Sequence, residues 1–208
     1  MSDSSTAPHR ESRILDIVTV FVLSVTAVLT AWCGFEASKW GGEMSIAFSQ
    51  ASSARIQATA AEGQARDARL YDLSMFTQWV LAEEAGNDEL RVFIEERFTP
   101  EFAVAFSAWE AGGRTERGPF VLDEYVPPGT DEAVELAATA DAKFEQALEN
   151  NQRGDNYSLL TVLFALVLFL TAMSQRDAAP WIRRVLLGLG IVVGVVGVII
   201  MLTFPVKI

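Results

Sequence analysis

The sequence predicts an all-α fold: three transmembrane helices and an extracytoplasmic antiparallel helical bundle with alanine-rich, coiled-coil packing. Three apolar stretches are long enough to cross a bilayer, which needs about 17–25 residues. The segment between the first two is charged and holds few helix breakers. A spacing of three and four residues, which marks a heptad repeat, continues from the first apolar stretch into this segment.

Apolar and charged residues are separated along the chain. Of the 208 residues, 50% are hydrophobic, yet the net charge is −11. Residues 34–156 hold 10 Lys/Arg and 23 Asp/Glu, a net charge of −13. So acidic a domain disfavours nucleic acid and anionic headgroups as partners. The single cysteine, Cys33, excludes an intrachain disulfide, and the single histidine, His9, leaves few candidates for metal or acid–base sites.

The basic flanks of the apolar stretches predict the topology. Lys and Arg favour the cytoplasmic side, and arginines precede the first span and separate the second from the third. The predicted order is a cytoplasmic tail (1–13), a first span (14–33), an extracytoplasmic helical domain (34–156), a second span (157–174), a cytoplasmic loop (175–180), a third span (181–204) and an extracytoplasmic tail (205–208). A cleaved signal peptide at Ile14–Cys33 is the alternative. The stretch is long for one and lacks a small-x-small cleavage site, which favours an uncleaved anchor.

The first span and the outer domain share one heptad phase, from Asp16 to Ala82. This phase predicts one helix that leaves the membrane without interruption, with a bend at Gly41–Gly42 as the alternative, and that ends at Gly86. Its small side chains allow another helix to approach closely. The predicted seam is Ala47, Ala51, Ala54, Ala58, Ala61, Ala65 and Ala68.

The rest of the outer domain predicts shorter helices and a return to the membrane. We expect a helix at Glu89–Phe98, a helix capped by Thr99 with Pro100 at its first position, and a loop at Gly112–Thr130. The last outer helix starts at Thr130 and continues into the second span. Its predicted seam is Ala133, Ala137, Ala140, Phe144, Ala147 and Asn151. Two seams in one chain favour an intrachain antiparallel pair, and a seam between subunits is the alternative.

Two features of the spans have a structural and a functional interpretation. Asp16, Thr19, Thr26 and Thr30 share one phase. In the structural interpretation, the threonine hydroxyls bond the backbone of their own helix. In the functional interpretation, several copies of the chain arrange these residues around an aqueous pathway. We expect no basic residue to pair with Asp16. In the third span, Gly190 and Gly194 form a Gly-x-x-x-Gly motif, which permits close helix crossing within or between monomers.

No motif for catalysis, phosphate binding or calcium binding occurs in the sequence, so we predict no enzyme, cofactor or metal. Just beyond the first span, Glu36, Lys39 and Glu43 have the spacing of an ordinary helical charge set. A cation site at the mouth of an assembly is the sharper hypothesis for these three residues.

Two stretches carry a resemblance. Residues 97–109 (RFTPEFAVAFSAW) and 150–157 (NNQRGDNY) resemble sequences in an uncharacterised family of bacterial integral membrane proteins. The members share one N-terminal span, a helical outer domain and two C-terminal spans. The resemblance implies a multi-pass protein of the bacterial cytoplasmic (inner) membrane with a cytoplasmic N-terminus, and it brings no activity or site residue.

These patterns predict a non-enzymatic membrane protein that forms a homo-oligomeric helical assembly or supports a partner membrane complex. The expected partners are the lipid bilayer, further copies of the chain, and a membrane or extracytoplasmic protein. One alternative is an oligomeric channel or transporter lined by the polar stripe of the first span. Another is an extracytoplasmic sensor that acts through a separate cytoplasmic partner.

Overall fold

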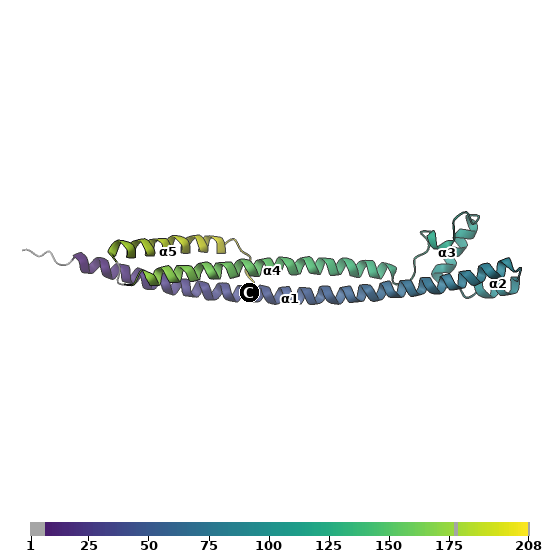
Figure 1. The fold of residues 1–208 in the computed structure, drawn as a ribbon, viewed down its shortest axis with the longest axis horizontal. Coiled ribbons are helices and arrows are strands. Elements are labelled where there is room, and N and C mark those ends of the chain that lie inside the picture. Colours follow the sequence, from purple (N-terminus) through teal and green to yellow (C-terminus); the bar gives the residue numbers. More distant parts are fainter. Residues whose placement is uncertain (1–6, 177–178, 208) are drawn as a thin grey trace, which may run out of the picture. The chain divides into compact units, whose positions relative to one another are not determined.

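The computed structural model describes residues 7–176 and 179–207, which are helical and contain no strand (Figure 1). The elements are α1 (Ala7–Glu84), α2 (Asp88–Glu95), α3 (Pro100–Ala111), the 3-10 helix η1 (Pro119–Val121), α4 (Thr130–Met173) and α5 (Pro180–Met201). The predicted all-α class is confirmed. Helices α1, α4 and α5 are each long and apolar enough to cross a membrane. Parts of the predicted tails and loop, at 1–6, 177–178 and 208, lie outside the described residues.

The chain divides into two compact units. Unit 1 combines the chain up to Phe48 with the chain from Glu145 onward, and unit 2 comprises Ser49–Phe144. Both α1 and α4 contribute to each unit. Each unit has its own packing.

Helix α1 is unbroken over 78 residues. It continues through Gly41 and Gly42, so the helix shows no interruption at this pair. It ends where predicted, because Gly86 adopts a left-handed conformation with φ 65° that other residues rarely take. Asn87 then caps α2, its side chain accepting the backbone N–H of Leu90 at 3.0 Å.

The predicted bounds of one helix need correction, and one predicted cap is confirmed. The predicted helix Glu89–Phe98 is Asp88–Glu95, because the chain leaves the helix at Glu96 and turns. Thr99 caps α3 as predicted, accepting the N–H of Phe102 at 3.3 Å. Thr130 opens α4, but its hydroxyl donates to the carbonyl of Pro127 at 2.7 Å.

In unit 1, α5 packs on α4 through glycines. A Cβ at Gly197 would lie only 2.9 Å from side-chain atoms of both Leu163 and Phe164, so only glycine allows this close approach. Helices α1 and α4 run antiparallel in this unit, and a Cβ at Gly154 of α4 would lie 3.5 Å from the carbonyl oxygen of Ala37 in α1.

In unit 2, α1 and α4 also run antiparallel. Arg55 of α1 forms an ion pair with Asp141 of α4. Gly129, just before α4, packs so tightly on α1 that a Cβ would lie 2.5 Å from the carbonyl oxygen of Ala61. The alanine side chains of both helices allow this approach, because they keep the backbones close.

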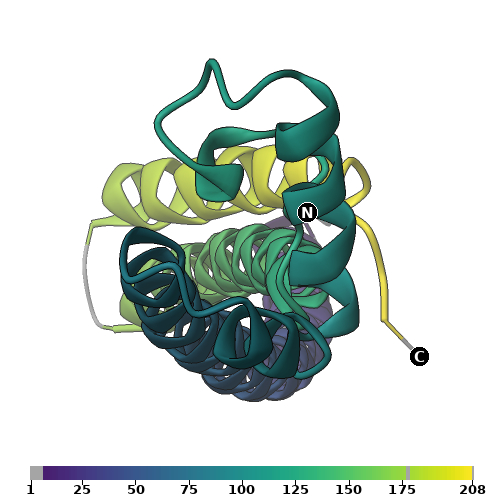
Figure 2. The same cartoon turned by 90° about the vertical axis from the view of Figure 1, so that its right-hand side faces the viewer.

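Helices α2 and α3 complete unit 2 around an aromatic core. In Figure 2, α2 lies back along α1, whereas α3 stands at a steep angle to it. The core is centred on Trp79, Phe102 and Phe106, and the rings of Trp79 and Phe106 meet edge to face with centroids 4.9 Å apart. Tyr125 from the predicted loop 112–130 is buried in the same core and Phe120 packs against it, so these side chains fix the loop.

Candidate functional site

The alanine seam lies inside the chain. On α1 of unit 2 four alanines of the predicted seam are buried, on α4 the matching face is buried as well, and Ala47 is buried in unit 1. The buried members in unit 2 are Ala51, Ala54, Ala58, Ala61, Ala133 and Ala140, and the half-buried ones are Ala65, Ala68 and Ala137. This face of α1 is therefore already packed within one copy of the chain.

The prediction of the second seam, on α4, was wrong at two positions. Phe144 is 45% exposed, and Asn151 is exposed as well. Asn150 and Gly154 are buried in their place. The buried face of α4 follows Ala147, Asn150 and Gly154, a spacing of three and four that the side-chain types alone did not reveal.

The polar stripe of the first span points into unit 1. Thr19 and Thr26 are buried and Thr30 is half-buried. The Thr19 hydroxyl donates to the carbonyl of Leu15 at 2.7 Å, and the Thr30 hydroxyl donates to that of Thr26 at 2.8 Å. Both bonds agree with the structural interpretation of these threonines, in which each hydroxyl donates to a carbonyl of its own helix.

Asp16 has a basic partner, contrary to expectation. Its carboxylate forms an ion pair with the guanidinium of Arg183 on α5. The pair joins two helices that are distant in sequence, so the residues around Asp16 gave no sign of it. A paired charge at this end of α1 ties α1 to α5.

The Gly-x-x-x-Gly motif of α5 faces α4 of the same chain. A Cβ at Gly190 would lie 3.1 Å from Oγ1 of Thr171, and one at Gly194 would lie 3.6 Å from Cγ1 of Val167. The neighbouring Gly188 has nothing within 4 Å of such an atom. The motif therefore serves packing within one copy.

Glu36 is a buried carboxylate with an unsatisfied oxygen. Its side chain is 0% exposed; Oε2 accepts the backbone N–H of Lys207 at 2.9 Å, whereas Oε1 has no hydrogen-bond partner. One turn further, the indole N–H of buried Trp40 also lacks a partner. The Lys207 ammonium bonds Glu43 at 3.2 Å. Two members of the predicted charge set, Glu36 and Glu43, thus bond the segment after α5, whereas Lys39 is exposed.

Asp72 is the buried carboxylate of unit 2, and both of its oxygens are used. Oδ1 accepts the hydroxyl of Thr99 and Oδ2 that of Tyr125, each at 2.8 Å. Burial, and next the hydrogen bond to Asp72, raise the pKa of the Tyr125 hydroxyl above its ordinary value of 10.0. Asp72 joins α1 to the cap of α3 and to the following loop. Its two partners are 27 and 53 residues away in the sequence and have no local signature there.

A second apolar face of α1 is uncovered. Leu70, Leu73, Val80 and Leu81 are exposed in unit 2, Leu81 by 65%. Leu70 and Asp72 lie about 200° apart around a helix of 3.6 residues per turn, so this face is opposite the aromatic core. We call these four residues, together with Leu90 and Phe93 of α2, the apolar strip.

The strip continues from α1 onto α2. Leu81 and Leu90 line one shallow hollow, and Leu90 and Phe93 line another. The two hollows share Leu90, so Leu81, Leu90 and Phe93 form one surface. Large contiguous apolar patches are unusual on the water-exposed surface of a protein and often mark interaction sites.

The described residues contain no cluster of three or more His, Cys, Asp or Glu side chains that could hold a metal ion. Comparisons with protein-family models, curated proteins and solved structures found no match. The three long apolar helices indicate a multi-pass membrane protein.

Proposed function

We propose that the chain is a non-enzymatic membrane protein that assembles with further copies of itself through the apolar strip. On this proposal the N-terminus is cytoplasmic, as in a bacterial inner membrane protein, and unit 2 is extracytoplasmic. The observation that carries the proposal is the exposure of the strip on a helix whose opposite face is already buried.

The spacing of the strip suits a helical partner. Leu70, Leu73 and Val80 are separated by three and seven residues, which is the repeat of a coiled-coil face. A second copy presents the same face, so an isologous pair would cover both strips at once. The strip replaces the alanine seam as the expected subunit contact, because the seam is occupied by α4.

The test introduces charge into the strip of the full-length protein. In mild detergent, native mass spectrometry of the wild type should show an oligomer. The double variant Leu73→Glu/Val80→Glu should raise the dissociation constant by about a hundredfold or more, because buried apolar contacts would be replaced by desolvated charges. The control Ser52→Glu/Thr59→Glu adds the same charges at the same spacing to exposed α1 positions outside the strip.

The control should assemble as the wild type does. A wild type that is strictly monomeric both in mild detergent and after crosslinking in vesicles would overturn the proposal. An oligomer unaffected by the strip variant would overturn the role of the strip.

The channel hypothesis makes an opposite prediction about the polar stripe. We expect single cysteines at Thr19, Thr26 and Thr30, in a Cys33→Ala background, to resist polar thiol reagents, because a thiol away from water does not ionise. Ser52→Cys, on an exposed part of α1, is the reactive control. Reaction at the stripe positions in assembled protein would favour a water-filled pathway instead.

A further inference from the structure

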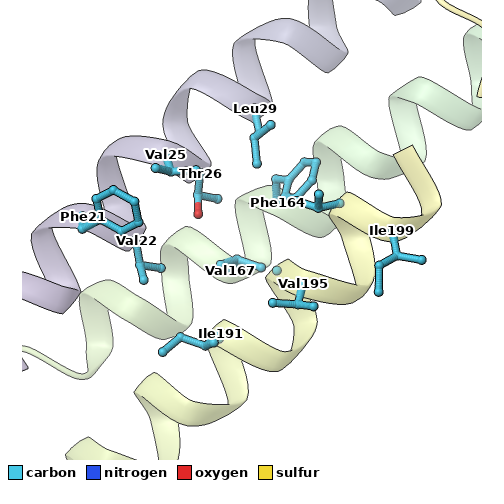
Figure 3. Close-up of a pocket in the computed structure, with 13 residues that line it drawn as sticks. Phe21, Val22, Val25, Thr26, Leu29, Phe164, Val167, Ile191, Val195 and Ile199 are labelled. Carbon is cyan, nitrogen blue, oxygen red and sulfur yellow. The ribbon is translucent and has the colours of Figure 1, made fainter. Parts of the chain in front are cut away.

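Unit 1 contains a hollow of about 310 Å³ between α1 and α5, with α4 as its floor (Figure 3). Every side chain around it is hydrocarbon except that of Thr26, and the glycines of α5 add only backbone. The hollow lies within the apolar stretches predicted to cross the membrane. Its surroundings are therefore expected to be lipid and not water.

Beyond each end of the hollow, α1 and α5 are in contact. At one end Asp16 pairs with Arg183. At the other end, the sulfur atoms of Cys33 and Met201 lie 3.9 Å apart. Between these contacts, the lining residues of α1 extend from Phe21 to Leu29, a rise of about 12 Å.

Gly194 shows that helix packing alone does not account for the hollow. At Gly197 a Cβ would lie 2.9 Å from α4, so glycine is needed for contact. At Gly194 the nearest atom would be 3.6 Å away, an ordinary contact distance, on Val167. A Cβ would fit against α4 here, and Gly194 lines the hollow together with Val25 and Val195.

We propose that this hollow holds one acyl chain of a membrane phospholipid. Water is disfavoured, since a buried water needs two to four polar partners and the lining side chains supply one hydroxyl, that of Thr26. A helix is too large, because it is about 10 Å across and two turns of it displace more than twice this volume. A single hydrocarbon chain is narrow enough, and it restores the dispersion contacts that empty space would lose.

The experiment uses the full-length protein in phosphatidylethanolamine vesicles that contain a small fraction of phosphatidylcholine with a diazirine in its acyl chain. After illumination, mass spectrometry maps the adducts. We expect half-buried residues of the hollow, such as Val22 and Val198, to be labelled more than outward residues such as Phe169 and Val185, which are 59% and 58% exposed.

Filling the hollow should remove its label. Gly194→Leu should lower labelling of the hollow about fivefold or more, since the new side chain takes the contacts of the acyl chain. Val25→Phe fills the same space from α1 and should act alike. Gly188→Leu is the matched control: it adds the same side chain to α5 where no atom lies within 4 Å of the new Cβ.

Three results would overturn the proposal. One is equal labelling of hollow and outward residues, which indicates bulk lipid only. Another is hollow labelling that survives both filling variants in folded protein. The third is a disulfide between two copies of Ile199→Cys in a Cys33→Ala background, which places a second copy over the hollow. Assembly through the apolar strip is tested separately from these results, so either proposal can fail alone.

Discussion

Helix α1 buries one carboxylate in each unit, and the two are satisfied differently. Asp72 in unit 2 is 1% exposed and accepts two hydroxyl hydrogen bonds. Glu36 in unit 1 is 0% exposed and accepts one backbone N–H, with its other oxygen left unsatisfied. Since an unsatisfied buried oxygen costs free energy, Asp72 stabilises its unit, whereas Glu36 stabilises its own unit much less.

The buried tryptophans repeat the contrast. In unit 2 the indole N–H of Trp79 donates to Glu95 at 2.6 Å. In unit 1 the N–H of Trp40 has no partner, although Arg153 stacks over its ring with the guanidinium carbon 4.7 Å from the centroid. Unit 2 therefore uses its buried polar groups to fix one arrangement of α1, α2 and α3. Unit 1 depends on apolar and glycine packing.

The largest effect is expected from Asp72→Ala. The change leaves the hydroxyls of Thr99 and Tyr125 without their acceptor, at a cost of about 3 kcal/mol to unit 2. Hydrogen exchange followed by mass spectrometry should show amides of α3 exchanging about a hundredfold faster. Asp67→Ala removes an exposed carboxylate from the same helix and is the control. Unchanged exchange in α3 would show that Asp72 does not hold that helix.

A smaller loss is expected from Tyr125→Phe, which keeps the ring in the aromatic core and removes only the hydroxyl. One hydrogen bond to a charged acceptor contributes about 1.5–3 kcal/mol, and the lower part of this range is expected because Asp72 keeps Thr99. Thermal unfolding followed by circular dichroism measures the change. Equal stability of variant and wild type at neutral pH would show that this hydrogen bond does not stabilise unit 2.

The same variant tests the pH dependence of unit 2. The pKa of Tyr125 is raised in the folded state, so its contribution is complete below the unfolded value of about 10 and is lost as the pH rises through the folded pKa. Wild-type unfolding temperature should therefore fall more steeply than that of Tyr125→Phe above about pH 10. Parallel curves for the two proteins would contradict the raised pKa.

Whether a feature of this fold can be predicted from the sequence depends on how far apart in the sequence its residues are. The heptad phase of α1, the end at Gly86 and the cap at Thr99 follow from neighbouring residues, and each could be read directly. The partner of Asp16 is 167 residues away, on α5. Such a contact depends on how the helices pack and has no local signature.

The candidate surfaces divide in the same way. The alanine seam was readable because small side chains recur with one period, but whether α4 or another subunit covers it could not be read from that period. The apolar strip could not be predicted because Leu70, Leu73 and Val80 alternate along the sequence with the buried residues Asp72 and Trp79. Apolar residues on both faces of one helix look like general hydrophobicity until the structure shows which face is covered.

The smallest effect is expected from Glu36→Gln, and it sharpens the contrast between the units. The amide oxygen of glutamine can still accept the N–H of Lys207, and the change removes a buried charge that has no cation within salt-bridge distance among the described residues. We expect the free energy of unfolding to change by less than about 1 kcal/mol.

The corresponding carboxylate-to-amide change in unit 2 is Asp72→Asn. It places an amide NH₂ group against one of the two hydroxyls that donate to Asp72. Its cost should exceed that of Glu36→Gln, because one hydroxyl must turn or lose its acceptor. Thermal unfolding of both variants in the same detergent gives the comparison directly. If Glu36→Gln destabilises as much as Asp72→Asn, then the charge of Glu36 is needed for folding, and its open oxygen must be satisfied by a group that binds the ionised carboxylate in the membrane-embedded protein.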